Sequence, residues 1–186
     1  MKLEESSSID IIAAVLSEAV SHVLEISTRK SIACAGTLQT IPKLIMRPDI
    51  SCFVQLSGDF NGLIVFNFND RTAVKLYRSY MTSMGIPEGD LVKDFTSNEV
   101  TDSIGEIFNQ VVGDFTRLVE TEFGLSILRG QPKVLALTSA ITLTIDADYH
   151  ENRRLAFSID NDRFQAELAL EQTQFTRLPD FKRPSS

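Results

Sequence analysis

Two long amphipathic segments, each followed by a block of strand-like runs, limit most strongly what this chain can fold into. In the first segment, residues 9–26, apolar residues recur every three and four positions after a serine run that can supply an N-cap. The second long segment begins at a capping box, residues 96–99, runs to about Phe123 and ends at Gly124. A shorter amphipathic helix that Asn69 or Asp70 can cap lies between them.

The strand-like runs are rich in β-branched and aromatic residues and lie in two blocks. They comprise residues 32–35, 52–56 and 63–68 in the first block and 134–145, 155–159 and 164–170 in the second. The last two runs alternate apolar with polar residues, which predicts a hairpin with one solvent-exposed face. The order helix, strands, helix, helix, strands predicts an α+β fold, an antiparallel sheet with helices packed on one face. The repetition of a long helix followed by strands indicates a duplicated unit.

Chain length and composition fit one domain. A chain of 186 residues with 43% hydrophobic composition can bury roughly 70% of its unfolded surface. We therefore expect a single domain over residues 1–186, with an ordered core at about 8–171 and a frayed tail from Phe175 onward.

Charge and residue inventory argue against several classes of function. The net charge of -7 disfavours nucleic acid and anionic membranes as partners. The longest apolar run is six residues, 11–16, which is too short for a transmembrane helix. Acidic residues replace the basic start of a secretory signal, and Cys34 and Cys52 form no C-x-x-C motif, so we expect a cytoplasmic protein. His22 and His150 lie in no metal-binding spacing, so we expect no metal site on the chain.

The helix predicted at 97–123 has an unusual polar stripe. At 100° per residue its apolar residues cluster on one side, whereas Asp102, Glu106, Asn109 and Gly113 cluster on the other. A solvated face explains the two acids. An asparagine and a glycine within a helix cost a few tenths and about 1 kcal/mol relative to alanine, so together they suggest a surface that another molecule approaches closely. The net charge of this segment, six acids against Arg117, would attract a basic patch.

Four residues match a known pattern. Asp102, Glu106, Asn109 and Pro132 fit Asp/Ser-x3-Glu-x2-Asn-x22-Pro with every spacing kept. In this, the chain resembles the CheC/CheX/FliY family of response-regulator phosphatases over roughly residues 8–171. The stretch 103–113 looks like the helix of that family, and residues 58–62 look like its hairpin turn.

The first helix departs from the pattern of family members that carry two motifs. Its equivalent positions are Ala14, Glu18 and Ser21, which keep the glutamate but lack the leading acid and the asparagine. The chain is therefore nearest to the single-motif, CheX-like proteins.

The resemblance implies a CheC-like fold with internal pseudo-duplication and a hydrolase activity in chemotaxis or other two-component signalling. The substrate would be the aspartyl phosphate of a phosphorylated CheY-like receiver domain, which also supplies Mg²⁺. Asn109 would orient the attacking water and Glu106 would dock the receiver's lysine. Asp102 and Gly113 would contact the receiver, and Pro132 would be structural.

Two alternatives remain open at the sequence level. One is a non-catalytic module of the flagellar-switch type that binds a receiver or self-associates, and an exposed edge strand would allow a homodimer. The other is a small-ligand enzyme, which the sequence supports little because it has no nucleophile–base pair and because residues 58–62 hold too few glycines for a phosphate loop.

Overall fold

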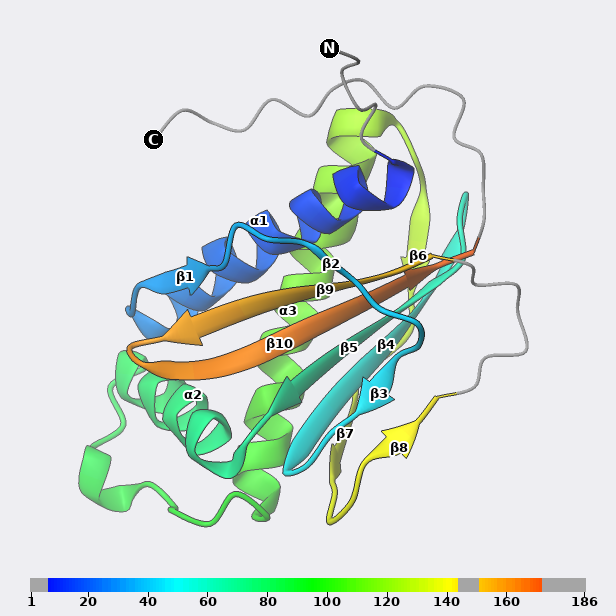
Figure 1. Cartoon of the computed structure of the whole chain (residues 1–186). Coiled ribbons are helices and arrows are strands. Elements are labelled where there is room, and N and C mark those ends of the chain that lie inside the picture. The colour runs from blue at the N-terminus through cyan, green and yellow to red at the C-terminus, as the bar shows by residue number, and fades with distance from the viewer. Residues whose placement is uncertain (1–6, 144–150, 172–186) are drawn as a thin grey trace.

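The computed structural model describes residues 7–143 and 151–171, and in it three helices lie against one face of a curled antiparallel sheet (Figure 1). The helices are α1 Ser8–Thr28, α2 Asp70–Ser83 and α3 Asn98–Phe123, with a 3-10 turn, η1, at Glu88–Asp90. The strands are β1 Ile32–Cys34, β2 Gln39–Thr40, β3 Ile45–Met46, β4 Ile50–Gly58, β5 Gly62–Phe68, β6 Ile127–Arg129, β7 Lys133–Ala136, β8 Ile141–Thr142, β9 Glu151–Ile159 and β10 Asp162–Leu170. The expected frayed tail lies outside the described residues.

The sheet is built from two interlocked halves. Its strand order is β1-β9-β10-β5-β4-β6, with β2 also paired to β9 and β7 to β4. In each half a long helix is followed by short edge strands and then by a hairpin: α1, β1 and β4–β5, then α3, β6–β7 and β9–β10. The edge strands are exchanged, because β1 pairs with the hairpin of the second half and β6 and β7 pair with that of the first. This arrangement agrees with the predicted duplication.

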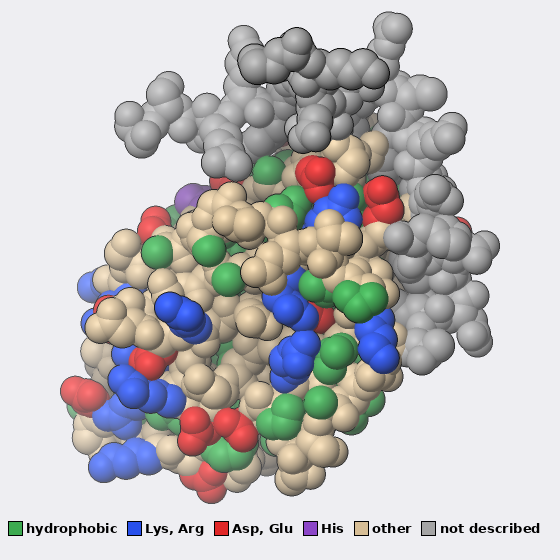
Figure 2. Space-filling view, in the orientation of Figure 1, with side chains coloured by type: hydrophobic (Ala, Val, Ile, Leu, Met, Phe, Trp, Pro, Cys, Tyr) green, Lys and Arg blue, Asp and Glu red, His purple; other side chains and the backbone are tan. Residues whose placement is uncertain are grey.

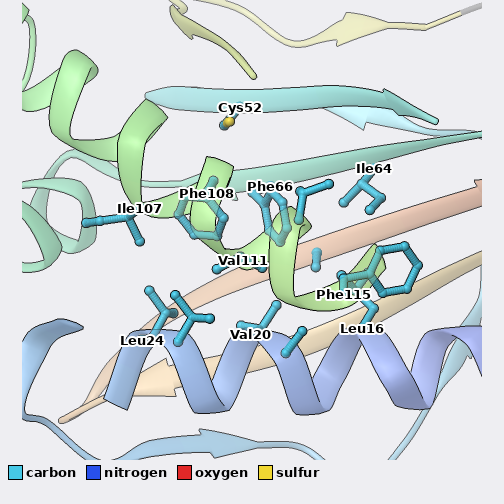
Figure 3. Close-up of a cluster of buried hydrophobic side chains, with 14 of the residues drawn as sticks. Leu16, Val20, Leu24, Cys52, Ile64, Phe66, Ile107, Phe108, Val111 and Phe115 are labelled. Atoms are coloured by element: carbon cyan, nitrogen blue, oxygen red, sulfur yellow. The ribbon is translucent and has the colours of Figure 1, made fainter. Parts of the chain in front are cut away.

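The core lies between the helices and the sheet. Leu16, Val20 and Leu24 of α1 face Phe108 and Phe115 of α3, with side chains of β4 and β5 above them (Figure 3). Cys52 of β4 belongs to this cluster, and burial raises the pKa of its thiol to about 12. Burial of these apolar faces is the main stabilising contribution to the fold.

The outer face of the sheet is covered in part by the segment that carries β2 and β3. A second apolar cluster joins this segment to the sheet: Leu44 and Met46 of the segment pack with Leu63, Val65 and Ala169 of β5 and β10. Elsewhere on this side Lys and Arg side chains are interspersed with hydrophobic ones (Figure 2). The expected solvent-exposed face of the last hairpin is therefore wrong for the second half of β10, where Glu167 and Ala169 are buried.

Most predicted elements are present, with two corrections. The run 134–145 is not one strand: β7 ends at Ala136 and β8 begins at Ile141, and residues 144–145 lie outside the described part of the chain. The predicted capping box at 96–99 is wrong: Thr96 is engaged with Asp94, and the N-cap is Ser97, whose hydroxyl accepts the bond from the Val100 N–H. Val100 then occupies the third helical position, and its apolar side chain cannot return a hydrogen bond to the cap.

No helix in the described ranges is long and apolar enough to cross a membrane.

Candidate functional site

Tight packing of one face of α3 fixes the orientation of the opposite face. The ring of Phe108 lies 4.2 Å from that of Phe66 and 5.2 Å from that of Phe68, measured between centroids. Ser97 caps the start of the helix, and Gly124, in the left-handed conformation at φ 67°, ends it. The side chains of Asp102, Glu106 and Asn109 are consequently held on the exposed side.

Glu106 lies beside a residue of α2. The Tyr80 side chain is buried, and the groups that act on its hydroxyl are Glu106 and Gln110 of α3. Burial, the Glu106 charge and hydrogen bonding to Glu106 raise the pKa of Tyr80 above its ordinary value, and Gln110 opposes this shift. Glu106 is therefore a carboxylate at the junction of α2 and α3.

Asn109 is held by a residue of β6. Arg129 Nη1 donates a hydrogen bond to Asn109 Oδ1 and another, of 3.0 Å, to the Asn109 backbone oxygen. The guanidinium then lies over Gly113, one turn further along: a Cβ at Gly113 would be 3.4 Å from Arg129 Nη2 and 3.5 Å from its Cζ. The space left by Gly113 is thus filled by a side chain of the same molecule.

Strand register explains why Arg129 reaches α3. Arg129 pairs with Leu56 of β4, which is buried in the core, so its side chain is on the helix-facing side of the sheet. Leu128 pairs with Ser57 and is exposed on the other side. Pro132 directly precedes β7, in which Val134 lies 3.4 Å from where a Cβ of Gly105 would be. Strands β6 and β7 therefore flank the polar stripe.

A third contact of α3 ties it to α1. His22 Nδ1 lies 3.0 Å from Asp114 Oδ2, and Arg117 Nη2 lies 2.6 Å from Asp114 Oδ1. Burial alone would raise the pKa of Asp114, but hydrogen bonds from Arg117 and His22 outweigh it and lower that pKa below its ordinary value. Asp114 is therefore a charged link between the helices, separate from the stripe.

The corresponding stripe of α1 has a different character. Ala14, Glu18 and Ser21 are half-buried along a hollow of about 320 Å³, whose lining also includes Cys34 and Leu38. The two halves of the fold thus present unlike surfaces, and only α3 carries an exposed acid and amide one turn apart at the motif positions.

The residue set suits hydrogen bonding better than metal binding. Among the described residues, no group of three or more His, Cys, Asp or Glu side chains is arranged to hold a metal ion. The stripe offers the Glu106 carboxylate, the Nδ2 group of the Asn109 carboxamide and the Arg129 guanidinium, which can bind a water and charged groups of a partner.

The structure brings Glu106 and Asn109 together on the exposed stripe and places Asp102 one turn before Glu106. Tyr80 and Arg129 were not predicted from the sequence. Tyr80 belongs to the core of the fold, and the one signal in the sequence that points to a polar contact is the need of a buried tyrosine hydroxyl for a partner. No sequence pattern points to Arg129. The roles assigned to the stripe residues, including partner contact by Asp102 and Gly113, stay predictions.

Comparisons with known proteins give the family and the fold. A family model described as "Protein of unknown function (DUF3334)" matches residues 4–186. Among curated proteins, none matches this chain in sequence.

Several solved structures are similar. The chemotaxis protein CheX from Desulfovibrio desulfuricans is 20% identical with a TM-score of 0.72, and the match covers 86% of this chain and 99% of that one. A chain of the CheX–CheY–BeF3–Mg²⁺ complex from Borrelia burgdorferi is 16% identical with a TM-score of 0.64, and the match covers 87% of this chain and 98% of that one. FliY from Thermotoga maritima is 16% identical with a TM-score of 0.64, covering 90% of each chain. The CheC-like α+β fold predicted from the sequence is confirmed.

Proposed function

The chain belongs to the DUF3334 family of proteins of unknown function, and we propose that it is a phosphatase acting on the aspartyl phosphate of a CheY-like receiver domain. The observation that carries the proposal is the geometry of α3. Glu106 and Asn109 are exposed one turn apart, on the stripe that also carries Asp102. Asn109 is held by Arg129 of β6, and Glu106 lies beside Tyr80 of α2. The likeness of the fold to CheX proteins, one of them in complex with CheY, supports this choice of substrate.

The reaction is the hydrolysis of an acyl phosphate. The oxygen of a water attacks phosphorus, the bond from phosphorus to the aspartyl oxygen breaks, and the aspartate leaves as a carboxylate. The protons of the water remain on the phosphate or pass to solvent. Because a carboxylate is a good leaving group, the step most in need of help is holding the water in line with that bond.

Asn109 would hold this water. Its carboxamide carries a donor and an acceptor, so it can fix the position of a water without acting as a base. Glu106 would bind the lysine of the receiver and set the docking register. Mg²⁺ bound to the receiver would neutralise the phosphoryl oxygens, so this chain needs to supply only position and charge.

The test of Asn109 is a phosphate-release assay with a phosphorylated receiver. Asn109→Ala should lower the stimulated rate at least about tenfold with little change in receiver affinity, because a water-orienting group acts mainly in the transition state. Asn161→Ala, an exposed asparagine in the β9–β10 turn, is the matched control and should leave the rate unchanged. Wild-type turnover by Asn109→Ala would contradict the mechanism. Binding without acceleration by the wild-type chain would indicate the non-catalytic module instead.

The test of Glu106 is receiver affinity as a function of salt. Glu106→Ala should weaken docking, and the difference from wild type should shrink as salt rises, because a charge pair at a partly solvated interface is screened. Glu122→Ala, another exposed acid of α3, serves as the control for general electrostatic attraction. Equal effects of the two substitutions would remove the specific docking role of Glu106.

A further inference from the structure

We propose that Arg129 is a positioning residue of this reaction, which holds the Asn109 carboxamide in the orientation that receives the attacking water. The inference rests on the proposed function, since it assigns a role within that site. Arg129 is not one of the four motif positions, and it is contributed by β6 rather than by α3.

The contacts define the position of the amide oxygen. Arg129 Nη1 bonds both Asn109 Oδ1 and the Asn109 backbone oxygen. The helix fixes the position of the Asn109 backbone oxygen, and this oxygen in turn fixes the guanidinium of Arg129. Because the same Nη1 group also bonds Asn109 Oδ1, it links the rotatable end of the Asn109 side chain to the rigid backbone of α3.

The surroundings let the guanidinium occupy this place. Gly113 provides the gap, because a Cβ there would lie 3.4–3.8 Å from the Arg129 side-chain atoms Nη2, Cζ and Nε. The pairing of Arg129 with Leu56 aims the side chain at α3 from the sheet edge. Helix composition and strand register thus both place the same cation beside Asn109.

The chemical consequence is a choice between the two ends of the amide. The χ2 torsion of asparagine has broad, roughly two-fold preferences, so a free carboxamide can present either its oxygen or its NH₂ group to a given point. A guanidinium has donors only and accepts no hydrogen bond, so it selects the oxygen. The Nδ2 group and the second lone pair of Oδ1 are then left for the water.

A double-mutant cycle tests whether Arg129 acts through Asn109. Arg129→Ala should lower kcat about tenfold to a hundredfold with KM for the phosphorylated receiver unchanged, as expected when a reacting group is misplaced. In the Asn109→Ala background the same substitution should have no further effect. An equal loss in both backgrounds would overturn the proposal, because Arg129 would then act directly on the phosphoryl group or on docking. A faster Arg129→Ala protein would also overturn it, because the contact would then be a block.

Lys133→Ala is the matched control for charge. Lys133 carries the same charge at the same sheet edge, but it pairs with Phe53, outside the main core, and thus lies on the other face of the sheet. Lys133→Ala should leave kcat unchanged. An equal fall in kcat for Lys133→Ala would overturn a specific role of Arg129.

A readout without substrate separates this inference from the proposed function. The side-chain amide resonances of Asn109, assigned by their loss in Asn109→Ala, should shift in Arg129→Ala and not in Lys133→Ala. Unshifted resonances would overturn the Arg129 contact while leaving the phosphatase proposal intact. If Arg129→Ala shifts these resonances but the wild-type chain never releases phosphate from the receiver, the proposed function is overturned, and with it the role of Arg129 in turnover.

Discussion

The Tyr80 hydroxyl is the point at which α2 contacts the polar stripe of α3, and its ionisation reports on Glu106. Because burial and the Glu106 carboxylate raise the pKa of Tyr80 above 10.0, folded Tyr80 keeps its proton at a pH where the unfolded chain has lost it. The free energy of unfolding should therefore fall as pH rises from about 10 through the pKa of the folded state.

Glu106→Gln should lower the pKa of Tyr80 towards its ordinary value, because it removes the negative charge that disfavours phenolate. Ultraviolet absorbance of the phenolate against pH measures this, with Tyr80→Phe identifying the signal among the three tyrosines of the chain. An unchanged titration curve in Glu106→Gln would show that the two side chains do not interact in solution.

At the residue scale, sequence spacing identified the exposed positions of α3 but not the residues that hold them. Asp102, Glu106 and Asn109 are separated by one helical turn each, so periodicity alone places them on one stripe. Tyr80 and Arg129 reach the same stripe from α2 and β6 through tertiary packing. No local pattern encodes such a contact, because it depends on strand register and on how the helices pack.

At the scale of the element, α3 contains two glycines within its length that meet different surroundings. Gly105 faces Val134 inside the molecule, whereas Gly113 lies on the stripe beneath Arg129. In both, an added Cβ would come no closer than 3.4 Å to a neighbouring side chain. Alanine at either position should therefore raise the free energy of unfolding, by up to about 1 kcal/mol, through better helix propensity.

The two substitutions should differ in activity. Gly113→Ala places a methyl group against the Arg129 guanidinium that holds Asn109, so receiver-stimulated phosphate release should fall, whereas Gly105→Ala should retain the wild-type rate and serves as the matched control. Urea unfolding and phosphate release measured on the same preparations check both parts. Identical rates for the two variants would show that a methyl group at Gly113 does not disturb the action of Arg129 on Asn109.

Long periodic elements could be predicted from the sequence, and short ones could not. Helix α3 spans many turns, so its apolar stripe is unmistakable. Strand β6 has three residues, too few to show any period, and it exists because β4 offers it a partner. In the sequence, the run 134–145 resembles one continuous strand. In the structure its pairing beside β4 ends near Leu137, whose N–H donates to the Asp49 carbonyl, and β8 forms separately at Ile141–Thr142. Pairing partners, rather than propensity, determined these boundaries.

At the scale of the whole molecule, the segment that crosses the outer face of the sheet is held in part by one buried acid. Glu167 is fully buried, with Oε1 at 2.8 Å from Arg154 Nη2 and Oε2 accepting a 2.9 Å hydrogen bond from the Ile45 N–H. Glu167→Ala should lower the free energy of unfolding by about 3 kcal/mol, because it leaves Arg154 and the Ile45 amide without their partner. Glu167→Gln keeps an acceptor and should cost less. Equal stability of the two variants in urea unfolding would contradict this account.

The proposed function gives a prediction for metal dependence. Chelating Mg²⁺ should stop the assisted reaction, because in the proposed mechanism the ion that neutralises the phosphoryl oxygens would be supplied by the receiver. Calorimetric titration of the isolated chain with Mg²⁺ should give no stoichiometric binding, and the isolated receiver is the positive control. A tight site on this chain would contradict the shared-site mechanism.

The exchange of edge strands between the two halves has a consequence for biosynthesis. Ile32 of β1 pairs with Ile159 of β9, so the first strand to leave the ribosome waits for nearly the last. Until then α1 can pack against α3, which is made earlier, but it lacks β9, its other partner in the finished fold. A nascent chain halted before the β9–β10 hairpin therefore exposes part of the apolar face of α1 and an open sheet edge, features that chaperones bind. The same interlocking makes the completed sheet hard to open from either end, since each edge is held by the half to which it does not belong.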